Sequence, residues 1–301
     1  GQPLSHRSAI PQVTGEAKYT DDIPSPPGTL YAAFVLSKEA HAKILSIDSS
    51  KAMALDGVVK FLTSKDLSTD ANKLGAILHD EQLFRSTEVT SAGQPLGLIV
   101  ATTDAIAQRA AKLVDVKYEP LPTVISIDDA IAVQSFHKVH HVISDGDVEQ
   151  GLKDSDIVLE GEMRVGGQEH FYLECNAALV IPGEGDELFI YCSTQNPTKT
   201  QNFAAHACGI QASKVVCKMK RMGGGFGGKE TRSVFISSSV ALAAYKLNKP
   251  VRINIDRDID MWITGGRHPF IGRYKVGAMK TGKINAIDLK LYNNGGYSLD
   301  L

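Results

Sequence analysis

Cysteine is scarce in this sequence, and none of its four cysteines lies in a Cys-x-x-Cys pair (Cys175, Cys192, Cys208 and Cys217). Zinc ribbons and iron–sulfur clusters need closely spaced thiolates, so neither is expected within these 301 residues. Isolated cysteines in a long chain are typical of a reducing compartment, where thiols stay free. We expect each of them to be a small buried hydrophobic residue.

The sequence also lacks an excess of charge of one sign, a long apolar run and an initial methionine. Its formal net charge is -2 at pH 7, and no block of basic residues appears, so no nucleic-acid partner is expected. No uncharged stretch reaches transmembrane length, and the N-terminal residues hold no apolar signal core, so no membrane partner is expected. A new apolar segment begins at the last residues, and we interpret the chain as a piece of a longer protein.

The composition, with 43% hydrophobic and 22% charged residues, is ordinary for a globular protein that can bury a core. The succession of strand-like and helix-like segments is that of an α+β protein. Residues 1–125 have the pattern of a mixed α/β domain, with an apolar strand at residues 96–101 and a helix expected after Thr103. Residues 126–150 carry little pattern, and we interpret them as a linker whose histidines are exposed rather than metal ligands (His137, His140 and His141).

Residues 151–301 form a second mixed unit. Asn196 and Pro197 are typical of a helix start and Gly209 of a helix end, so a helix is predicted between them. A largely buried helix is predicted over residues 233–247. The remaining predictions for this unit are strands at 158–165, 188–194, 214–220 and 251–255, a polar strand edge with Glu169 and His170 at 166–174, an ion-paired turn at 256–260 and a hairpin around 281–282.

A glycine-rich stretch, Arg221 to Glu230, follows one of these strands and precedes the buried helix. Its spacing fits the dinucleotide fingerprint, but the strand before it alternates polar and apolar residues, whereas a first Rossmann strand is apolar on both faces. It also fits seven positions of the P-loop, but the eighth is Glu230 where a magnesium-binding hydroxyl is required. What remains is a backbone that can approach a flat or anionic ligand, with Phe226 as one apolar face.

Gln195 lies where a strand ends and a helix begins, a common position for ligand contacts in open α/β sheets. Its amide can donate or accept a hydrogen bond without carrying charge. The alternative is that it satisfies the backbone of the turn.

The stretch from Lys220 to Arg232 resembles the molybdenum-cofactor loop of the xanthine dehydrogenase family. Further segments resemble that family in the same order, so the likeness covers nearly the whole chain; they are 15–24, 41–44, 166–174, 193–195, 256–258 and 265–270. The resemblance implies a hammerhead domain over 1–125 and the N-terminal part of a molybdenum-cofactor-binding domain over 151–301.

The resemblance also implies a reaction and a set of partners. This family hydroxylates purines, other aromatic heterocycles or aldehydes with oxygen from water on Mo-molybdopterin, and electrons leave through 2Fe–2S clusters and FAD to NAD or O2. The expectation is a cytoplasmic or peroxisomal homodimer in which the other domains of the same chain supply the iron–sulfur clusters, FAD and the general base. This stretch alone is expected to be inactive.

Residue by residue, Gln195 matches the glutamine that hydrogen-bonds a molybdenum oxo ligand. Phe226 and Gly227 match backbone positions that line the cofactor, and Glu230 matches the acid that binds the purine substrate. Aldehyde oxidases of the same family usually carry an apolar residue at that last position, so Glu230 favours purine hydroxylation. The alternatives are an aldehyde oxidase, a nucleotide-binding protein that uses the glycine loop, and a non-catalytic scaffold.

Overall fold

The computed structural model describes residues 1–137 and 142–300. The chain divides into two compact units, and each is assembled from separate stretches of sequence. Unit 1 comprises Gly1–Leu121, His170–Gly265 and Tyr297–Leu301, and unit 2 comprises Pro122–Glu169 and Gly266–Gly296. In the described residues, no helix is long and apolar enough to cross a membrane.

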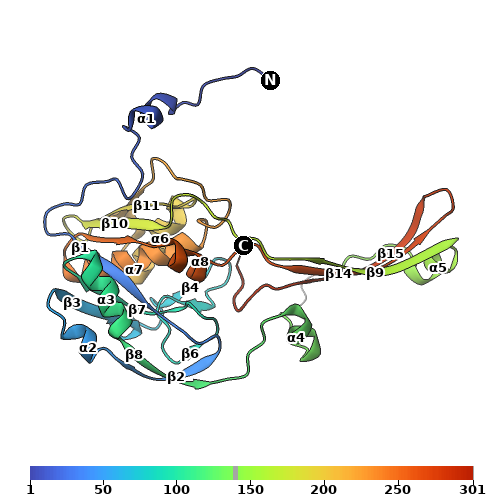
Figure 1. Ribbon diagram of the computed structural model, residues 1–301, viewed down its shortest axis with the longest axis horizontal. Coiled ribbons are helices and arrows are strands. Elements are labelled where there is room, and N and C mark those ends of the chain that lie inside the picture. The colour runs from blue at the N-terminus through green and yellow to red at the C-terminus, as the bar shows by residue number, and fades with distance from the viewer. Residues whose placement is uncertain (138–141, 301) are drawn as a thin grey trace. The chain divides into compact units, whose positions relative to one another are not determined.

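Unit 1 is organised around a seven-stranded sheet with the strand order β12-β11-β10-β13-β1-β7-β3 (Figure 1). Its strands are β1 (Leu30–Leu36), β3 (Val58–Thr63), β7 (Pro95–Ala101), β10 (Ala177–Pro182), β11 (Leu188–Cys192), β12 (Val215–Lys218) and β13 (Val251–Asn254). The sheet is continuous because β1 pairs in parallel with β13, Leu30 opposite Val251. Strands from the two ends of the sequence therefore share one sheet.

Helices cover both faces of this sheet. On one face lie α6 (Pro197–Cys208) and α7 (Arg232–Leu247), and Leu98 and Val100 of β7 belong to the same core cluster as α7. On the other face α3 (Asp104–Leu113) packs against Ile99 and Ala101. Successive strand residues point to opposite faces, so burial on both sides explains why β7 is a continuous apolar run.

Shorter elements complete unit 1. A three-stranded sheet has the order β6-β2-β8, and β4 pairs with β5. The bounds are α1 Ala9–Thr14, β2 Ala42–Asp48, α2 Ser50–Met53, η1 Ser64–Asp66, β4 Lys73–Leu74, β5 Glu81–Gln82, β6 Glu88–Val89, β8 Asp115–Pro120, η2 Ala212–Lys214 and α8 Arg257–Thr264.

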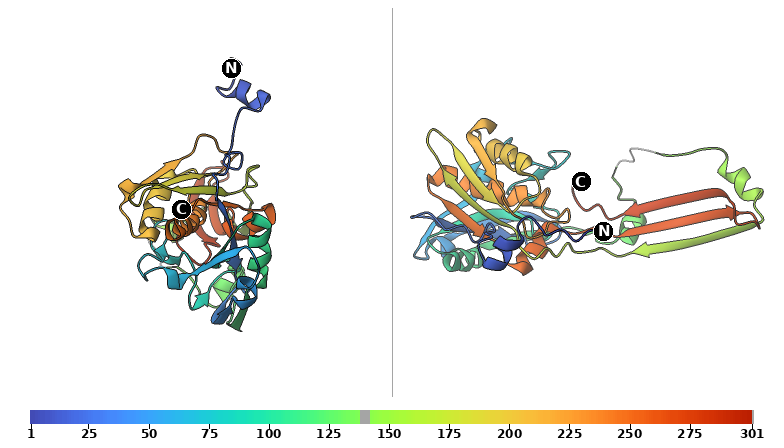
Figure 2. Two further views of the ribbon diagram at one scale, coloured as in Figure 1. Left: turned by 90° about the vertical axis from the view of Figure 1, so that its left-hand side faces the viewer. Right: turned by 90° about the horizontal axis from the view of Figure 1, so that it is seen from above.

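Unit 2 contains a three-stranded antiparallel sheet of the order β15-β14-β9, seen in the right-hand view of Figure 2. Its elements are α4 (Ile127–Ala132), α5 (Val148–Lys153), β9 (Ile157–Val165), β14 (Phe270–Ala278) and β15 (Ile284–Asn293). The register places Leu159, Val276 and Ile287 in one row, and Leu159 and Ile287 are exposed. One face of this sheet is thus apolar, whereas the other carries charged residues such as Glu162 and Arg273.

Most of the predicted elements are confirmed, and the helix ends are confirmed in detail. The Asn196 side chain accepts a hydrogen bond from the backbone N–H of Lys199, Pro197 is the first helical residue, and Gly209 adopts a left-handed conformation after the last turn. The buried helix and the hairpin around Gly282 are also present.

Three predictions about local structure are wrong or incomplete. Residues 256–260 are not an ion-paired turn, because helix α8 begins at Arg257, with Asp256 at its N-cap position. Residues 166–174 are irregular apart from one bridge between Gln168 and Arg267, so they are not a strand edge. The weakly patterned stretch contains α4 and the start of α5. His140 and His141 lie outside the described residues.

Candidate functional site

The glycine-rich loop leaves the sheet at its edge. Strand β12 lies at one edge of the seven-stranded sheet. Its residue Val215 is buried, while Val216 and Lys218 are exposed. An edge strand with one exposed face alternates in sequence, which is the pattern that argued against a Rossmann strand. Helix α7 begins at Arg232 after the loop, two residues beyond Glu230.

Two glycines are required by close packing around the loop. A Cβ atom at Gly225 would lie 2.5 Å from Oε1 of Gln195, and one at Gly228 would lie 2.8 Å from Cγ of His170. The loop backbone is therefore pressed against the end of β11 on one side and against the irregular 170–176 segment on the other. No larger residue fits at either position without displacing a neighbour.

Gln195 is held so that its amide group has a fixed direction. Its Oε1 accepts hydrogen bonds from the backbone N–H groups of Gly227, at 2.9 Å, and Lys229, at 3.2 Å. Its own backbone N–H donates to the Lys229 carbonyl at 2.8 Å. Only the carbonyl end of an amide can accept from two N–H groups, so Nε2 is the end that remains for a ligand. Gln195 is exposed and therefore presents a hydrogen-bond donor beside the loop.

Lys229 faces away from any ligand of the loop. Its side chain is fully buried, and its Nζ donates to the Glu174 carbonyl oxygen at 2.5 Å and to Ser193 Oγ at 2.6 Å. A P-loop lysine has to reach the phosphates of the nucleotide. The P-loop interpretation, already disfavoured by Glu230, is thus incompatible with the position of this ammonium group. Burial lowers the pKa of Lys229, and the charge of Glu174 opposes that shift.

The irregular segment 170–176 supplies residues that the sequence did not reveal as part of the site. Glu174 Oε2 accepts from the backbone N–H of Gly223 at 2.7 Å and from Ser193 Oγ at 2.7 Å. The Tyr172 ring lies 4.5 Å from Lys229 Nζ and is fully buried. The dense polar and aromatic composition of 166–174 was the available signal, but only the fold brings Glu174 to the loop.

Phe226 and Glu230 lie on the accessible side of the loop. Phe226 is 74% exposed and has a φ of 52°, a left-handed conformation that is rare for a bulky residue. Glu230 is half-buried, and among the described residues none donates a hydrogen bond to its carboxylate. Phe226, Gly227 and Glu230 thus lie on the glycine loop, and Gln195 contacts this loop through the N–H of Gly227.

These groups fit a large cofactor with oxygen acceptors. The loop offers a backbone surface without side chains at positions where only glycine fits. Gln195 offers one uncharged hydrogen-bond donor with a fixed direction. In the described part of the chain, no three His, Cys, Asp or Glu side chains could hold a metal ion together.

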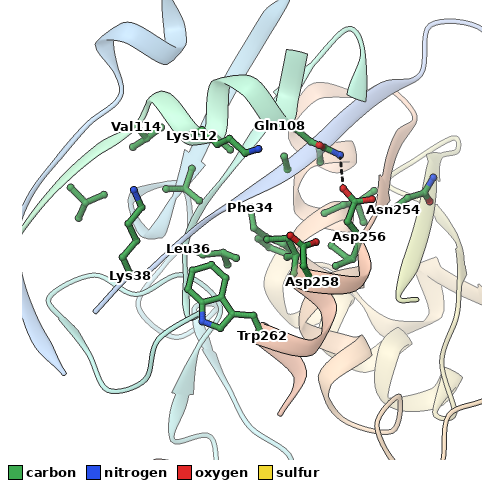
Figure 3. Close-up of a pocket in the computed structure, with 18 of the residues that line it drawn as sticks. Phe34, Leu36, Lys38, Gln108, Lys112, Val114, Asn254, Asp256, Asp258 and Trp262 are labelled. Atoms are coloured by element: carbon green, nitrogen blue, oxygen red, sulfur yellow. Dashed lines mark hydrogen bonds between the residues drawn. The ribbon is translucent and has the colours of Figure 1, made fainter. Parts of the chain in front are cut away.

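A pocket of about 320 Å³ lies elsewhere in unit 1 (Figure 3). It is lined by parts of β1, α3, β8, β13 and α8, with Trp262 and Phe34 exposed to it and Gln108 Nε2 donating to Asp256 Oδ2 at 3.4 Å. No residue of the glycine loop lines it.

Two family models match the chain. The molybdopterin cofactor-binding domain matches residues 133–301, and the a/b hammerhead domain of aldehyde oxidase and xanthine dehydrogenase matches residues 14–122. The xanthine dehydrogenase of Dictyostelium discoideum is 52% identical over 300 residues, which are 100% of this chain and 22% of that protein. The xanthine dehydrogenase/oxidase of Gallus gallus is 50% identical over 302 residues, again 100% of this chain and 22% of that protein. The chain thus spans less than a quarter of the length of these relatives.

Solved structures of related proteins share the fold. The aldehyde oxidoreductase from Desulfovibrio gigas aligns with a TM-score of 0.86 at 26% identity, covering 95% of this chain and 34% of that one. The quinoline 2-oxidoreductase from Pseudomonas putida 86 has the same fold, with a TM-score of 0.85 at 24% identity over 96% of this chain and 38% of that one. The α+β fold and Mo-molybdopterin as the cofactor, both expected from the sequence, are confirmed. The molybdopterin model alone covers more than half of the 301 residues, and the chain therefore belongs to the molybdenum hydroxylase family of xanthine dehydrogenases and aldehyde oxidases.

Proposed function

We propose that this chain is part of a xanthine dehydrogenase that hydroxylates purines, converting hypoxanthine to xanthine and xanthine to urate. The observation that carries the proposal is that the Gln195 amide is bound to the backbone N–H of Gly227 in the glycine loop, which also carries Phe226 and Glu230. The amide is a fixed donor, and the carboxylate has no partner among the described residues. Relatives whose sequences are 50–52% identical to this chain are named xanthine dehydrogenase or xanthine dehydrogenase/oxidase, which supports the same proposal.

Each residue has a distinct part in this proposal. Molybdopterin, when bound, supplies the oxygen-transfer and redox chemistry. Gln195 Nε2 donates a hydrogen bond to an oxygen of the cofactor, and the backbone at Phe226 and Gly227 forms one wall of its site. Glu230 binds the polar edge of the purine and stabilises charge that develops on the ring, provided that the proton is placed on the correct partner.

The partners and the domain limits belong to the same proposal. The hammerhead domain at 1–125 and the cofactor domain at 151–301, with a linker at 126–150, belong to this proposal; the family matches at 14–122 and 133–301 support two domains, although the second match includes part of the linker. In the whole protein, 2Fe–2S clusters and FAD carry the electrons to NAD or O2, and the protein is a cytoplasmic homodimer. The second candidate function is that of an aldehyde oxidase, which is favoured by the fold shared with the aldehyde oxidoreductase from Desulfovibrio gigas.

The role of Gln195 is tested with two variants of the full-length enzyme. Gln195→Ala removes the side chain, whereas Gln195→Glu keeps an oxygen for the N–H groups of Gly227 and Lys229 but loses the donor. Both are expected to slow reduction of the metal by substrate about 10- to 100-fold, the effect of one lost hydrogen bond of about 1–3 kcal/mol. Molybdenum content and protein abundance should hold. Unchanged reduction kinetics in both variants would show that the assignment is wrong.

A further inference from the structure

We propose that Lys229 is a positioning residue, whose buried ammonium group locks the glycine loop and thereby fixes the Gln195 amide as a donor. The inference rests on the proposed function of Gln195. It concerns a different side chain, one that cannot itself touch a ligand of the loop because it is fully buried behind it.

The ammonium group uses all three of its hydrogen-bond donors inside the protein. Nζ lies 2.5 Å from the carbonyl oxygen of Glu174, 2.6 Å from Ser193 Oγ and 3.3 Å from Glu174 Oε2. The Tyr172 ring covers it at 4.5 Å. An ammonium group has three donors and no acceptor, so this environment satisfies it completely.

The backbone of Lys229 forms two hydrogen bonds with Gln195. The N–H of Lys229 donates to Gln195 Oε1, and the carbonyl of Lys229 accepts from the Gln195 backbone N–H. A displacement of Lys229 therefore moves both the side chain and the backbone of Gln195. The carbonyl also accepts from Ser233 Oγ at 2.7 Å, so the start of α7 holds the same peptide group.

Glu174 accepts hydrogen bonds from residues at both ends of the glycine loop. Its Oε2 accepts from the backbone N–H of Gly223, the first glycine, and from Nζ of Lys229, after the last glycine. Its Oε1 accepts from the backbone N–H of Thr20 at 3.3 Å, which anchors the carboxylate to the N-terminal stretch of unit 1. Glycine backbones lose much conformational entropy when they are ordered, so this loop depends on such external ties.

Lys229 and Glu230 are neighbours in the sequence, but their side chains lie in different environments. Lys229 points inward and sets the shape of the loop, whereas Glu230 remains half-buried on the accessible side. Removing the ammonium group leaves the Glu174 carboxylate, which is 12% exposed, without its nearest positive charge. The expected consequence is a loose loop and a Gln195 amide that samples several directions.

The test uses the full-length holoenzyme with Lys229→Met, and Lys249→Met as the control because Lys249 is exposed beyond the end of α7 and outside the loop. In Lys229→Met, hydrogen exchange of a peptide spanning 221–230 should accelerate at least about ten-fold, while peptides from α7 and β11 keep their protection. The maximal rate of metal reduction should fall about ten-fold or more with little change in substrate affinity, since the donor is misplaced rather than the substrate site. Lys249→Met should change neither quantity.

Unchanged loop exchange in Lys229→Met would overturn the proposal, and so would faster exchange with a normal reduction rate. If Lys229→Met does not fold, Ser193→Ala removes one acceptor of the ammonium group and should produce a smaller change in the same direction. The Glu174→Gln/Lys229→Met double variant no longer holds a carboxylate at position 174 without its counter-charge, so the protein yield should exceed that of Lys229→Met. Hydrogen exchange of the loop should nevertheless stay fast, because the ammonium group is still absent. Normal reduction in Gln195→Ala, by contrast, overturns the role proposed for Gln195 itself, so the two failures can be told apart.

Discussion

Arg232 and Glu81 form a bidentate ion pair, with Nη1 donating to Oε2 at 2.9 Å and Nη2 to Oε1 at 2.7 Å. Arg232 is the first residue of α7, and Glu81 belongs to the two-residue strand β5 in the N-terminal half of unit 1. Asp300 contacts the same guanidinium group at 2.5 Å. A cation at a helix N-terminus opposes the helix dipole, and the two acids offset that cost. The helix that follows the glycine loop is thus tied directly to the N-terminal half of the sequence.

Breaking this pair should destabilise unit 1 strongly. Arg232→Met leaves Glu81, which is 4% exposed, without its counter-charge, and a lost partner in a buried pair costs about 3–5 kcal/mol. The free energy of unfolding can be followed in urea through Trp262, the single tryptophan, which lies in unit 1. The control is Lys43→Met, because its pair with Glu119 is about half exposed on both sides and should contribute at most ~1 kcal/mol. Similar losses in the two variants would contradict the prediction.

A methyl group at Gly225 should disturb the site from inside. In Gly225→Ala the new Cβ would lie 2.5 Å from Gln195 Oε1 and 2.8 Å from Met222 Cε, so one of them has to move. We expect a loss of about 1–3 kcal/mol in unfolding free energy, typical of overpacking, together with slower metal reduction in the full-length enzyme. Gly166→Ala meets nothing within 4 Å and serves as the control. A Gly225→Ala protein as stable and active as that control would show that the loop can relax.

Glu230 should decide between purines and aldehydes. Glu230→Val in the full-length enzyme removes a carboxylate that no described residue uses, so folding should be little affected. Turnover of purines should fall about 10- to 100-fold, as expected for a lost charge-assisted hydrogen bond, whereas turnover of aldehydes should persist. The measurement is kcat/KM on a panel of both substrate classes, with Glu184→Val, at an exposed turn, as the control. Equal losses on both classes would exclude a role in substrate recognition.

The cysteines should differ sharply in reactivity. The Sγ atoms of Cys192 and Cys217 lie 3.6 Å apart, and the hydrogen bond from Cys192 lowers the pKa of Cys217. Burial raises the pKa of Cys208 to about 12. Since the thiolate is the reacting form, iodoacetamide should modify Cys217 before Cys208, and at a pH below the usual range for a thiol. Mass spectrometry of alkylated peptides at increasing pH checks the order, and modification of Cys208 before Cys217 would contradict it.

Local signals allowed much of the fold to be predicted from the sequence. The ends of α6 were predictable because Asn196, Pro197 and Gly209 each act through their immediate neighbours. The helix α8 was missed because its acidic residues resemble a turn. Its apolar residues Ile259 and Ile263, four positions apart, pack against the core and decide the outcome.

The part of the site that could not be predicted depends on long-range contacts. Gln195, Phe226, Gly227 and Glu230 came from resemblance and from their place next to a strand end or in a glycine loop. The contact between Lys229 and Glu174 joins residues 55 positions apart, and no local pattern reports it. The orientation of the Gln195 amide likewise requires the positions of two backbone N–H groups that only the folded loop provides.

The parallel pairing of β1 with β13 has a consequence for biosynthesis. Leu30 is synthesised roughly 220 residues before its partner Val251, so the nascent chain holds β1 with one edge unpaired while those residues are made. An unpaired edge of an apolar strand is a template for association with other chains. Between the synthesis of β7 and that of β13, the emerging chain should therefore depend on chaperones that cover this edge, and truncation before Val251 should yield an aggregating product.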